Sequence, residues 1–275
     1  MTNAMQFKAR IKNMAAKNRV PAQAVLQNFM FERLLERISL SKYKNQVILK
    51  GGMLIASMVG ISSRTTMDMD TTLKGLPLTE AAICTAFQEI CAIACDDDVV
   101  LVFDHVAPIR DEDAYGGFRV AIAAQYQSIR TPLKVDITTG DVITPEAVRY
   151  CFPSLFEEKA IEVWAYPIET ILAEKVETIL RRSVLNTRPR DFYDVYILLE
   201  TQRAAIDKAV FASALRNTAK KRGSTAALED WKRIVYNIQA DEIMQQRWEQ
   251  YGKTYPYAKG ISFADVIGAV EEVLR

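Results

Sequence analysis

Lys50-Gly51-Gly52, followed by Asp68-Met69-Asp70, is the segment that decides the fold expected for this chain, and a third aspartate follows at Asp136. Asp68 and Asp70 lie in an expected strand, where alternate side chains point to the same face of a sheet. Two carboxylates held side by side repel each other and lose hydration, and a divalent cation between them relieves both effects. The pair therefore indicates a Mg²⁺ site and transfer of a phosphoryl or nucleotidyl group.

The two glycines join an apolar strand at Val47–Leu49 to a short helix expected at 53–59. Glycine lets backbone N–H groups come close to a phosphate, and a helix N-terminus favours negative charge. The loop before the carboxylate strand adds Arg64 and Thr66. D-x-D and Gly-Gly are weak signals alone. The ordered set of strand, glycine turn, helix, D-x-D strand and later aspartate is more specific.

The composition is ordinary for a globular protein, with 49% hydrophobic and 25% charged residues among 275. This length suits one large domain or two modest ones. Residues 1–20 lack the apolar core of a signal peptide, and no stretch has the ~18 apolar residues of a membrane span. We therefore expect a cytoplasmic protein without a membrane partner. The net charge of +1 does not decide for or against nucleic acid, but residues 1–44 carry nine Lys or Arg and two Glu.

The four cysteines do not indicate a zinc site. No C-x-x-C pair is present, and the single histidine, His105, cannot complete a site of the usual kind. We expect small buried thiols instead.

Hydrophobic patterning predicts an α+β protein with a mixed sheet in its N-terminal half. Three further strands are expected at Val99–Val106, Phe118–Gln127 and Leu133–Thr138, and their short connections favour antiparallel neighbours. From Pro167 onward the pattern is almost wholly helical. This change predicts an α/β domain at 1–150, with helices at its N-terminus, and a mainly helical domain at 151–275.

A second group of candidate residues lies in the helix expected at 168–182. Lys175 falls near the centre of its apolar face, where a lysine is costly unless it pairs with an anion or reaches the edge. A snorkelling or salt-bridged lysine is the simpler interpretation. Nearby arginines favour an anion site, in which Lys175 would hold a nucleotide phosphate; they are Arg181, Arg182, Arg188 and Arg190.

The third group is the segment Arg188–Asp194, in which Pro189 presets a helix start. Asp191 and Asp194 lie one turn apart near that N-terminus. One aspartate is explained by the helix dipole and an Arg–Asp contact. The other is expected to accept a proton or to orient a substrate hydroxyl.

Together these motifs resemble the AbiEii/AbiGii-type nucleotidyltransferase toxins, within the DNA polymerase β-like superfamily. The segment from Lys50-Gly51-Gly52 to Asp68-Met69-Asp70 resembles their first motif, and Lys134–Ile137 the second. Ala173–Arg182 and Arg188–Asp194 resemble the third and fourth. The resemblance covers about residues 45–200.

The resemblance implies a role for each candidate residue. Asp68 and Asp70 would hold one or two Mg²⁺ ions, and Asp136 would be the third carboxylate. Lys175 would contact nucleotide phosphates, and Asp191 or Asp194 would act in catalysis. Gly51, Gly52, Arg64, Thr66 and Arg190 would help to bind the nucleotide. The chain departs from the family where Arg190 replaces a lysine and Met53 replaces a threonine.

We therefore expect a Mg²⁺-dependent nucleotidyltransferase that moves an NMP from an NTP to an acceptor hydroxyl. The favoured acceptor is RNA, above all tRNA, and the expected setting is the toxin half of a toxin–antitoxin pair used in abortive phage infection. A cognate antitoxin is then a candidate partner. Three alternatives are protein nucleotidylation, a catalytically inactive nucleotide-binding module, and a DNA-binding regulator, which no helix-turn-helix signature supports. Fold-level analogy does not separate the acceptors.

Overall fold

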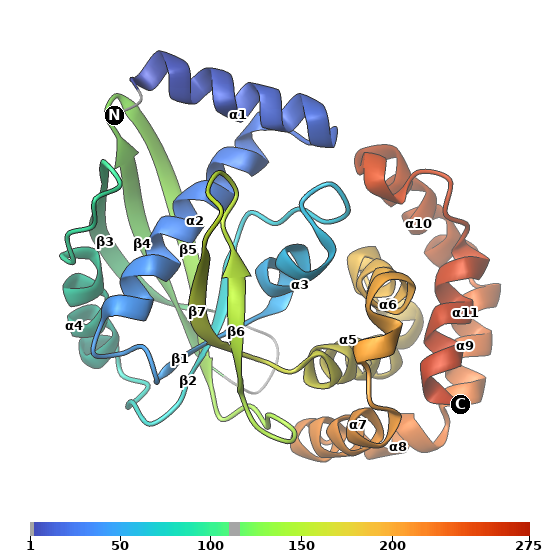
Figure 1. Cartoon of the computed structure of the whole chain (residues 1–275). Helices are drawn as coiled ribbons and strands as arrows, with labels where there is room; N and C mark the ends of the chain where they lie inside the picture. Colours follow the sequence, from blue (N-terminus) through green and yellow to red (C-terminus); the bar gives the residue numbers. More distant parts are fainter. Residues whose placement is uncertain (1–2, 110–115) are drawn as a thin grey trace. The chain divides into compact units, whose positions relative to one another are not determined.

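The computed structural model describes residues 3–109 and 116–275, and these form two compact units (Figure 1). The first unit comprises residues 1–140 and 148–165, and the second comprises residues 141–147 and 166–275. The division predicted at residue 150 thus falls within the first unit, which takes in a further hairpin.

The first unit is built on a seven-stranded sheet of order β3-β4-β5-β2-β1-β7-β6. Its strands are β1 (Val47–Lys50), β2 (Met69–Leu73), β3 (Val99–Ile109), β4 (Gly117–Tyr126), β5 (Ile129–Thr139), β6 (Val148–Pro153) and β7 (Ala160–Ala165). The β2–β5 and β1–β7 pairs are parallel and the others antiparallel. The predicted α+β class with a mixed sheet is confirmed.

Four helices accompany this sheet: α1 (Ala4–Asn18), α2 (Ala22–Leu40), α3 (Gly51–Val59) and α4 (Glu80–Cys91). Asn3 and Gln6 form a capping box at the start of α1. The Thr79 side chain caps α4 by accepting from Ala82 N at 3.3 Å. Pro21 lies one residue before α2 rather than in its first turn.

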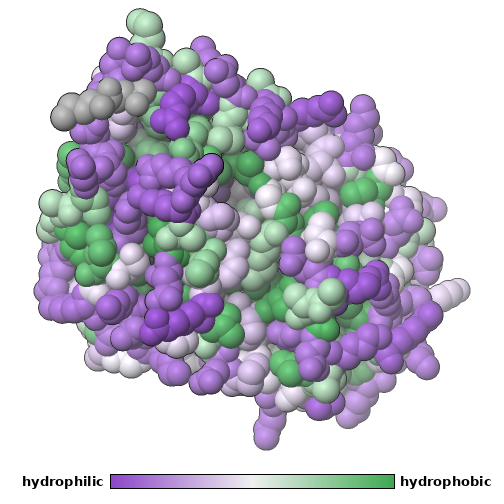
Figure 2. Space-filling model, viewed as in Figure 1, coloured by the Kyte–Doolittle hydropathy of each residue, from purple (hydrophilic) through white to green (hydrophobic). Residues whose placement is uncertain are grey.

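The core of the first unit lies between one face of the sheet and the helices α2 and α4. Both helices contact the sheet and each other. In β4 and β5 alternate residues are buried, as the period of a strand requires, and Val120, Ile122, Val135 and Ile137 are at most 2% exposed. The residues between them form the opposite, more polar face. In the view of Figure 2 hydrophilic residues cover much of the outer surface, and hydrophobic residues form smaller areas.

The β6–β7 hairpin is the one pair of strands that the sequence analysis did not place. Ile161, Val163 and Ala165 are buried and alternate with the more exposed residues Glu162 and Trp164. Each strand has only six residues, so the alternation is short. β7 is ordered by its parallel pairing with the distant β1, a long-range contact that local patterning does not reveal.

The second unit is helical, as predicted for the chain after Pro167. Its helices are α5 (Ile168–Arg182), α6 (Pro189–Gln202), α7 (Lys208–Arg222), α8 (Thr225–Glu229), α9 (Trp231–Ala240), α10 (Glu242–Thr254) and α11 (Phe263–Leu274). α5 has the predicted bounds and packs against α6 and α7. In the described part of the chain no helix combines the length and the hydropathy that crossing a membrane requires.

Candidate active site

Four charged residues form a row across the centre of the sheet in the first unit. Lys50 on β1 is the register partner of Asp70 on β2, and Asp70 is the partner of Asp136 on β5. Asp136 is in turn the partner of Arg119 on β4. Register partners point to the same face of a sheet, and neighbouring strands lie about 4.8 Å apart. This charged row therefore places two predicted carboxylates side by side, with a cation at each end.

The Gly51-Gly52 turn closes over Asp70. Gly51 has a φ of +68°, and Gly52 N donates to Asp70 Oδ2 at 3.4 Å. A Cβ on Gly51 would lie 2.1 Å from the same oxygen. The glycines thus allow the Asp70 carboxylate to lie close to the backbone of the turn, whereas the sequence predicted that a phosphate would do so. Phosphate binding by this turn stays a prediction.

Asp68 lies one residue before β2, so it is oriented by the preceding loop rather than by the strand. Thr66 Oγ1 donates to Asp68 O at 3.1 Å and accepts from Asp68 N at 3.4 Å. The pKa of Asp68 is raised, first by burial and then by the charges of Asp136 and Asp70; Arg119 opposes this rise. The three predicted carboxylates therefore interact electrostatically. We call Asp68, Asp70 and Asp136 the carboxylate cluster.

Asp136 forms an ion pair with an arginine on the neighbouring strand. Arg119 Nε donates to Asp136 Oδ1 and Arg119 Nη2 to Asp136 Oδ2, both at 2.7 Å. Hydrogen bonding to Asp136 is also the main cause that raises the pKa of Arg119. This two-pronged contact is the strongest geometry available to an arginine and a carboxylate.

The carboxylate chemistry of the cluster suits a divalent cation. Hard cations prefer carboxylate oxygens, and a cation would relieve the repulsion that raises the pKa of Asp68. Within residues 3–109 and 116–275, however, no three His, Cys, Asp or Glu side chains converge as ligands of one metal ion. Asp68 and Asp70 thus suit a cation, whereas Asp136 is turned to Arg119. Coordination of one metal ion by all three carboxylates stays a prediction.

The other two residues of the first motif lie beside the glycine turn. Arg64 is only 4% exposed, and its Nη2 would be 3.2 Å from a Cβ on Gly52. The Thr66 hydroxyl would be 3.1 Å from the same point. Arg64 also donates to Thr65 O. Both side chains are thereby packed into the turn, where they support Gly52 and Asp68.

In the second unit the structure brings together Lys175, Asp191 and Asp194. Lys175 Nζ on α5 lies 2.7 Å from Asp191 Oδ1 and 2.9 Å from Asp194 Oδ2 on α6. The side chains of the two aspartates are 4% and 0% exposed, and that of Lys175 is 17% exposed. The salt-bridged interpretation of Lys175 is thus realised. Asp191 Oδ2 is buried and has no hydrogen-bond partner among the described residues.

The arginines after Lys175 lie in different surroundings, and an anion site formed by them stays a prediction. Arg181 Nε donates to the buried Glu177 at 3.0 Å. Arg188 and Arg190 are exposed, and in the described part of the chain Arg190 makes no hydrogen bond or ion pair with the Lys175 group. Glutamates one turn away on α5, unnoticed in the sequence, neutralise part of the predicted anion site.

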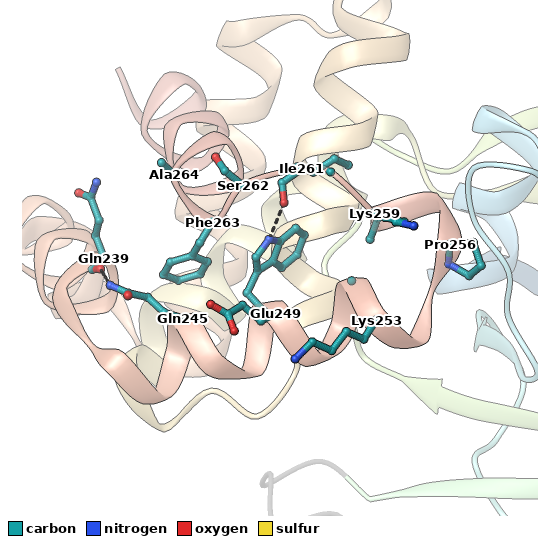
Figure 3. Close-up of a pocket in the computed structure, with 14 residues that line it drawn as sticks. Gln239, Gln245, Glu249, Lys253, Pro256, Lys259, Ile261, Ser262, Phe263 and Ala264 are labelled. Carbon is teal, nitrogen blue, oxygen red and sulfur yellow. Dashed lines mark hydrogen bonds between the residues drawn. The ribbon is translucent and has the colours of Figure 1, made fainter.

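A large pocket lies elsewhere in the second unit, among α9, α10 and α11 (Figure 3). It has a volume of about 1110 Å³. Trp248 Nε1 donates to Ile261 O at 2.9 Å along one wall, and Glu249, Lys253 and Lys259 also line it. None of the predicted candidate residues lines this pocket.

Two residues that support the carboxylate cluster were missed in the sequence. Arg119 is the only charged residue of β4, on the face opposite Val120 and Ile122. Gln27 on α2 donates to Met67 O at 3.3 Å and to Pro132 O at 2.9 Å, and so ties the loop before β2 to β5. Each is a polar residue within an apolar segment, which is the signal that could have identified them.

Comparison with known proteins agrees with this architecture. Two solved structures have similar folds. JHP933 from Helicobacter pylori has 15% sequence identity, 92% of each chain is covered, and the TM-score is 0.51. The nucleotidyltransferase toxin MenT4 from Mycobacterium tuberculosis has 13% identity, 97% of each chain is covered, and the TM-score is 0.53. A comparison with curated proteins gives no match. Residues 33–269 match the family described as "Nucleotidyl transferase AbiEii toxin, Type IV TA system". Because this match spans most of the chain, the protein belongs to the AbiEii family of nucleotidyltransferase toxins.

Proposed function

We propose that this nucleotidyltransferase transfers an NMP from an NTP to a hydroxyl of RNA, with tRNA as the favoured acceptor, and that it requires Mg²⁺. The observation that carries the proposal is the register pairing of Asp70 with Asp136, together with the electrostatic coupling of Asp68 to both. Crowded carboxylates on a sheet are costly without a cation. A reaction that uses such a cation best accounts for this crowding.

The proposed reaction is a substitution at the α-phosphorus of the NTP. The acceptor hydroxyl oxygen forms a new bond to this phosphorus, the bond to the bridging oxygen breaks, and pyrophosphate leaves with its electron pair. The hydroxyl proton passes to a carboxylate, for which the cluster and Asp191 are the candidates. Asp68 and Asp70 would hold Mg²⁺, which supplies positive charge to the phosphates when bound. The glycine turn and Thr66 keep these two carboxylates in place.

Within the second unit, Lys175 is proposed to contact the nucleotide phosphates. Its amine now neutralises Asp191 and Asp194, so it would exchange part of that pairing for phosphate oxygens. The side chain retains 17% exposure, which leaves a route for a ligand. Asp191 is the better candidate for contact with substrate, because its side chain retains 4% exposure whereas that of Asp194 is 0% exposed. Arg190 is exposed at the start of the same helix and is proposed to assist nucleotide binding.

The RNA acceptor is supported by the charge on α1. Its sequence contains four cations and no acidic residue, and Lys8, Arg10, Lys12 and Lys17 are all exposed. By contrast, two of the other basic residues in the N-terminal segment are buried in ion pairs, Arg33 with Glu32 and Arg37 with Asp97. The available positive charge is therefore concentrated on one exposed helix, which suits binding to a phosphate backbone.

Labelling in vitro tests this proposal. Wild-type protein, Asp70→Asn and the surface control Asp104→Asn are incubated with Mg²⁺, each α-³²P NTP in turn and total bacterial RNA, and the products are resolved on a gel. We expect label in an RNA band with wild type and the control but not with Asp70→Asn. Label on protein instead would favour protein nucleotidylation. The absence of label with any NTP, despite measurable NTP binding, would favour an inactive nucleotide-binding module.

The biological setting follows the family, whose members are toxins of type IV toxin–antitoxin systems. We propose that a cognate antitoxin accompanies this chain and that the pair acts in abortive phage infection. Expression of the chain alone should then arrest bacterial growth, and Asp70→Asn should abolish the arrest. Arrest that persists with Asp70→Asn would mean that toxicity does not need the carboxylate cluster.

A further inference from the structure

Arg119 is the residue whose contacts the proposed reaction leaves unexplained. Its guanidinium approaches Asp136 with two hydrogen bonds of 2.7 Å, and it is also attracted to Asp68 and Asp70. Asp136 has the position that the family resemblance gives to a metal ligand. A protein cation thus already engages both oxygens of the third carboxylate.

The exposure of this ion pair argues against a purely structural role. The Arg119 side chain is 43% exposed and that of Asp136 is 20% exposed. A pair with this access to water contributes little to stability. The neighbouring residues on the same face of β4, Ala121 and Ala123, are small and carry no charge. The charge on this face of β4 is therefore placed only where Asp136 is its register partner.

The orientation of the guanidinium also matters. Nε and Nη2 each take one oxygen of Asp136, so both oxygens are engaged at once. A cation that binds Asp136 must share these oxygens with Arg119 or displace it, and it meets the repulsion of a fixed positive charge. Asp68 and Asp70 have no such two-pronged arginine contact among the described hydrogen bonds.

We propose that Arg119 is a positioning residue that competes with the divalent cation for Asp136, so that cation binding begins at Asp68 and Asp70 and is weakened by Arg119. This inference rests on the proposed function, because it assumes that the cluster binds a divalent cation. It goes further by assigning a role to a residue outside the three carboxylates. Arg119 then sets the cation concentration at which the cluster fills.

Mn²⁺ binding to the full chain tests the inference without relying on activity. Free Mn²⁺ is measured by electron paramagnetic resonance during titration of wild type, Arg119→Gln, Arg119→Lys and Asp136→Asn. Removal of one positive charge should tighten Mn²⁺ binding about tenfold in Arg119→Gln, even for a site open to water. Arg119→Lys keeps the positive charge but lacks the planar guanidinium, so its Mn²⁺ affinity should remain closer to that of wild type.

The double variant Arg119→Gln/Asp136→Asn identifies the route of the effect. If Arg119 acts through Asp136, replacing Arg119 in the Asp136→Asn background should change the affinity much less than it does in wild type. Equal tightening in both backgrounds would overturn the assignment to Asp136. Unchanged or weaker binding in Arg119→Gln would overturn the competition itself. Thermal unfolding of every variant in EDTA shows whether each is folded. If Arg119→Gln is not folded, Arg119→Lys is compared with wild type instead.

The labelling experiment separates this inference from the proposed function. Transfer of NMP by wild type with unaltered Mn²⁺ affinity in Arg119→Gln would overturn the inference and leave the function standing. Tighter Mn²⁺ binding in Arg119→Gln without any transfer by wild type would support the inference and contradict the function. If neither protein binds Mn²⁺, both the competition and the proposed cation site are overturned.

Discussion

Gly51 and Asp70 approach so closely that a Cβ on Gly51 would lie 2.1 Å from Asp70 Oδ2. Gly51 also has a φ of +68°, a backbone conformation that other residues adopt only at a cost. One position in the chain thus meets two separate demands for glycine. The first comes from the backbone of the turn and the second from the carboxylate beneath it.

The two demands can be separated by mutation. Gly51→Ala should lose about 1–3 kcal/mol of stability because of its φ, and it should also displace Asp70 and abolish labelling. Gly60→Ala at the end of the same helix is the matched control, with a φ of +87° and no atom nearer to its Cβ than Ser62 Oγ at 3.9 Å. It should lose similar stability and keep its activity. Thermal unfolding and labelling rates are measured for both variants. If Gly51→Ala remains active, the reaction tolerates displacement of Asp70.

Asp68 should make the stability of the protein depend on pH. Its raised pKa means that, as pH rises from about 4, the unfolded chain loses this proton before the folded protein does. Stability from this group is therefore lost as pH rises through the folded pKa. In EDTA, Asp68→Asn should unfold at a higher temperature than wild type at pH 7, and the difference should shrink as pH falls toward 4. Asp96→Asn, at an exposed position, serves as the control. An Asp68→Asn protein that is less stable than wild type at pH 7 would contradict this explanation.

Much of this architecture was predictable because the signals were local. The apolar stripe of α5 gave its bounds, and the D-x-D motif with the later Asp136 identified three residues that the sheet places within reach of one another's charge. The alternation of apolar residues in β4 and β5 was equally readable. Each of these features depends on residues a few positions apart, which is the range over which periodicity is informative.

The pairing between distant residues was not predictable in the same way. Nothing in the spacing of Arg119 and Asp136 reveals that β4 and β5 align them as partners. A slip of one residue in register would turn Arg119 to the other face of the sheet. The arginines near Lys175 posed the same difficulty, because their charge was counted without the glutamates of α5. Pairing depends on packing, which a single sequence does not specify.

Glu177 provides a stability prediction in the second unit. It is fully buried and accepts from Arg181 Nε at 3.0 Å, Arg222 Nη1 at 2.6 Å and Ser224 Oγ at 2.8 Å. Burial alone would lower the pKa of Arg222, but Glu174 and Glu177 raise it. Arg222→Gln should therefore cost about 2 kcal/mol, less than a buried carboxylate left with no partner. Exposed Lys220→Gln should stay within about 0.5 kcal/mol of wild type. Urea unfolding measures the free energy of unfolding of both variants. Equal losses of stability would contradict a stabilising role for the contacts between Arg222 and Glu177.

The cysteines should differ sharply in reactivity. Burial raises the pKa of Cys91 to about 12, so almost none of this thiol is ionised at pH 8. Cys151 on β6 is exposed, which departs from the expectation that all four thiols are buried. Native protein treated with a disulfide reagent at pH 8 should show one fast thiol, and Cys151→Ser should remove that phase. A fast phase that survives in Cys151→Ser would assign it to Cys84 or Cys95 instead.

Asp191 and Asp194 share Lys175 but should not share a role. Asp191 has one buried oxygen without a partner among the described residues, whereas the Asp194 side chain is 0% exposed. Asp191→Asn should slow labelling about 100-fold or more, because a substrate hydroxyl that reaches this oxygen finds an acceptor with no competing hydrogen bond. Asp194→Asn should slow it less than tenfold, and both substitutions should lower the unfolding temperature, since each removes a buried counter-ion of Lys175. Labelling rates at saturating NTP, measured beside thermal unfolding, decide between the two. The reverse order of rates would assign the substrate contact to Asp194 and leave the free oxygen of Asp191 without a function.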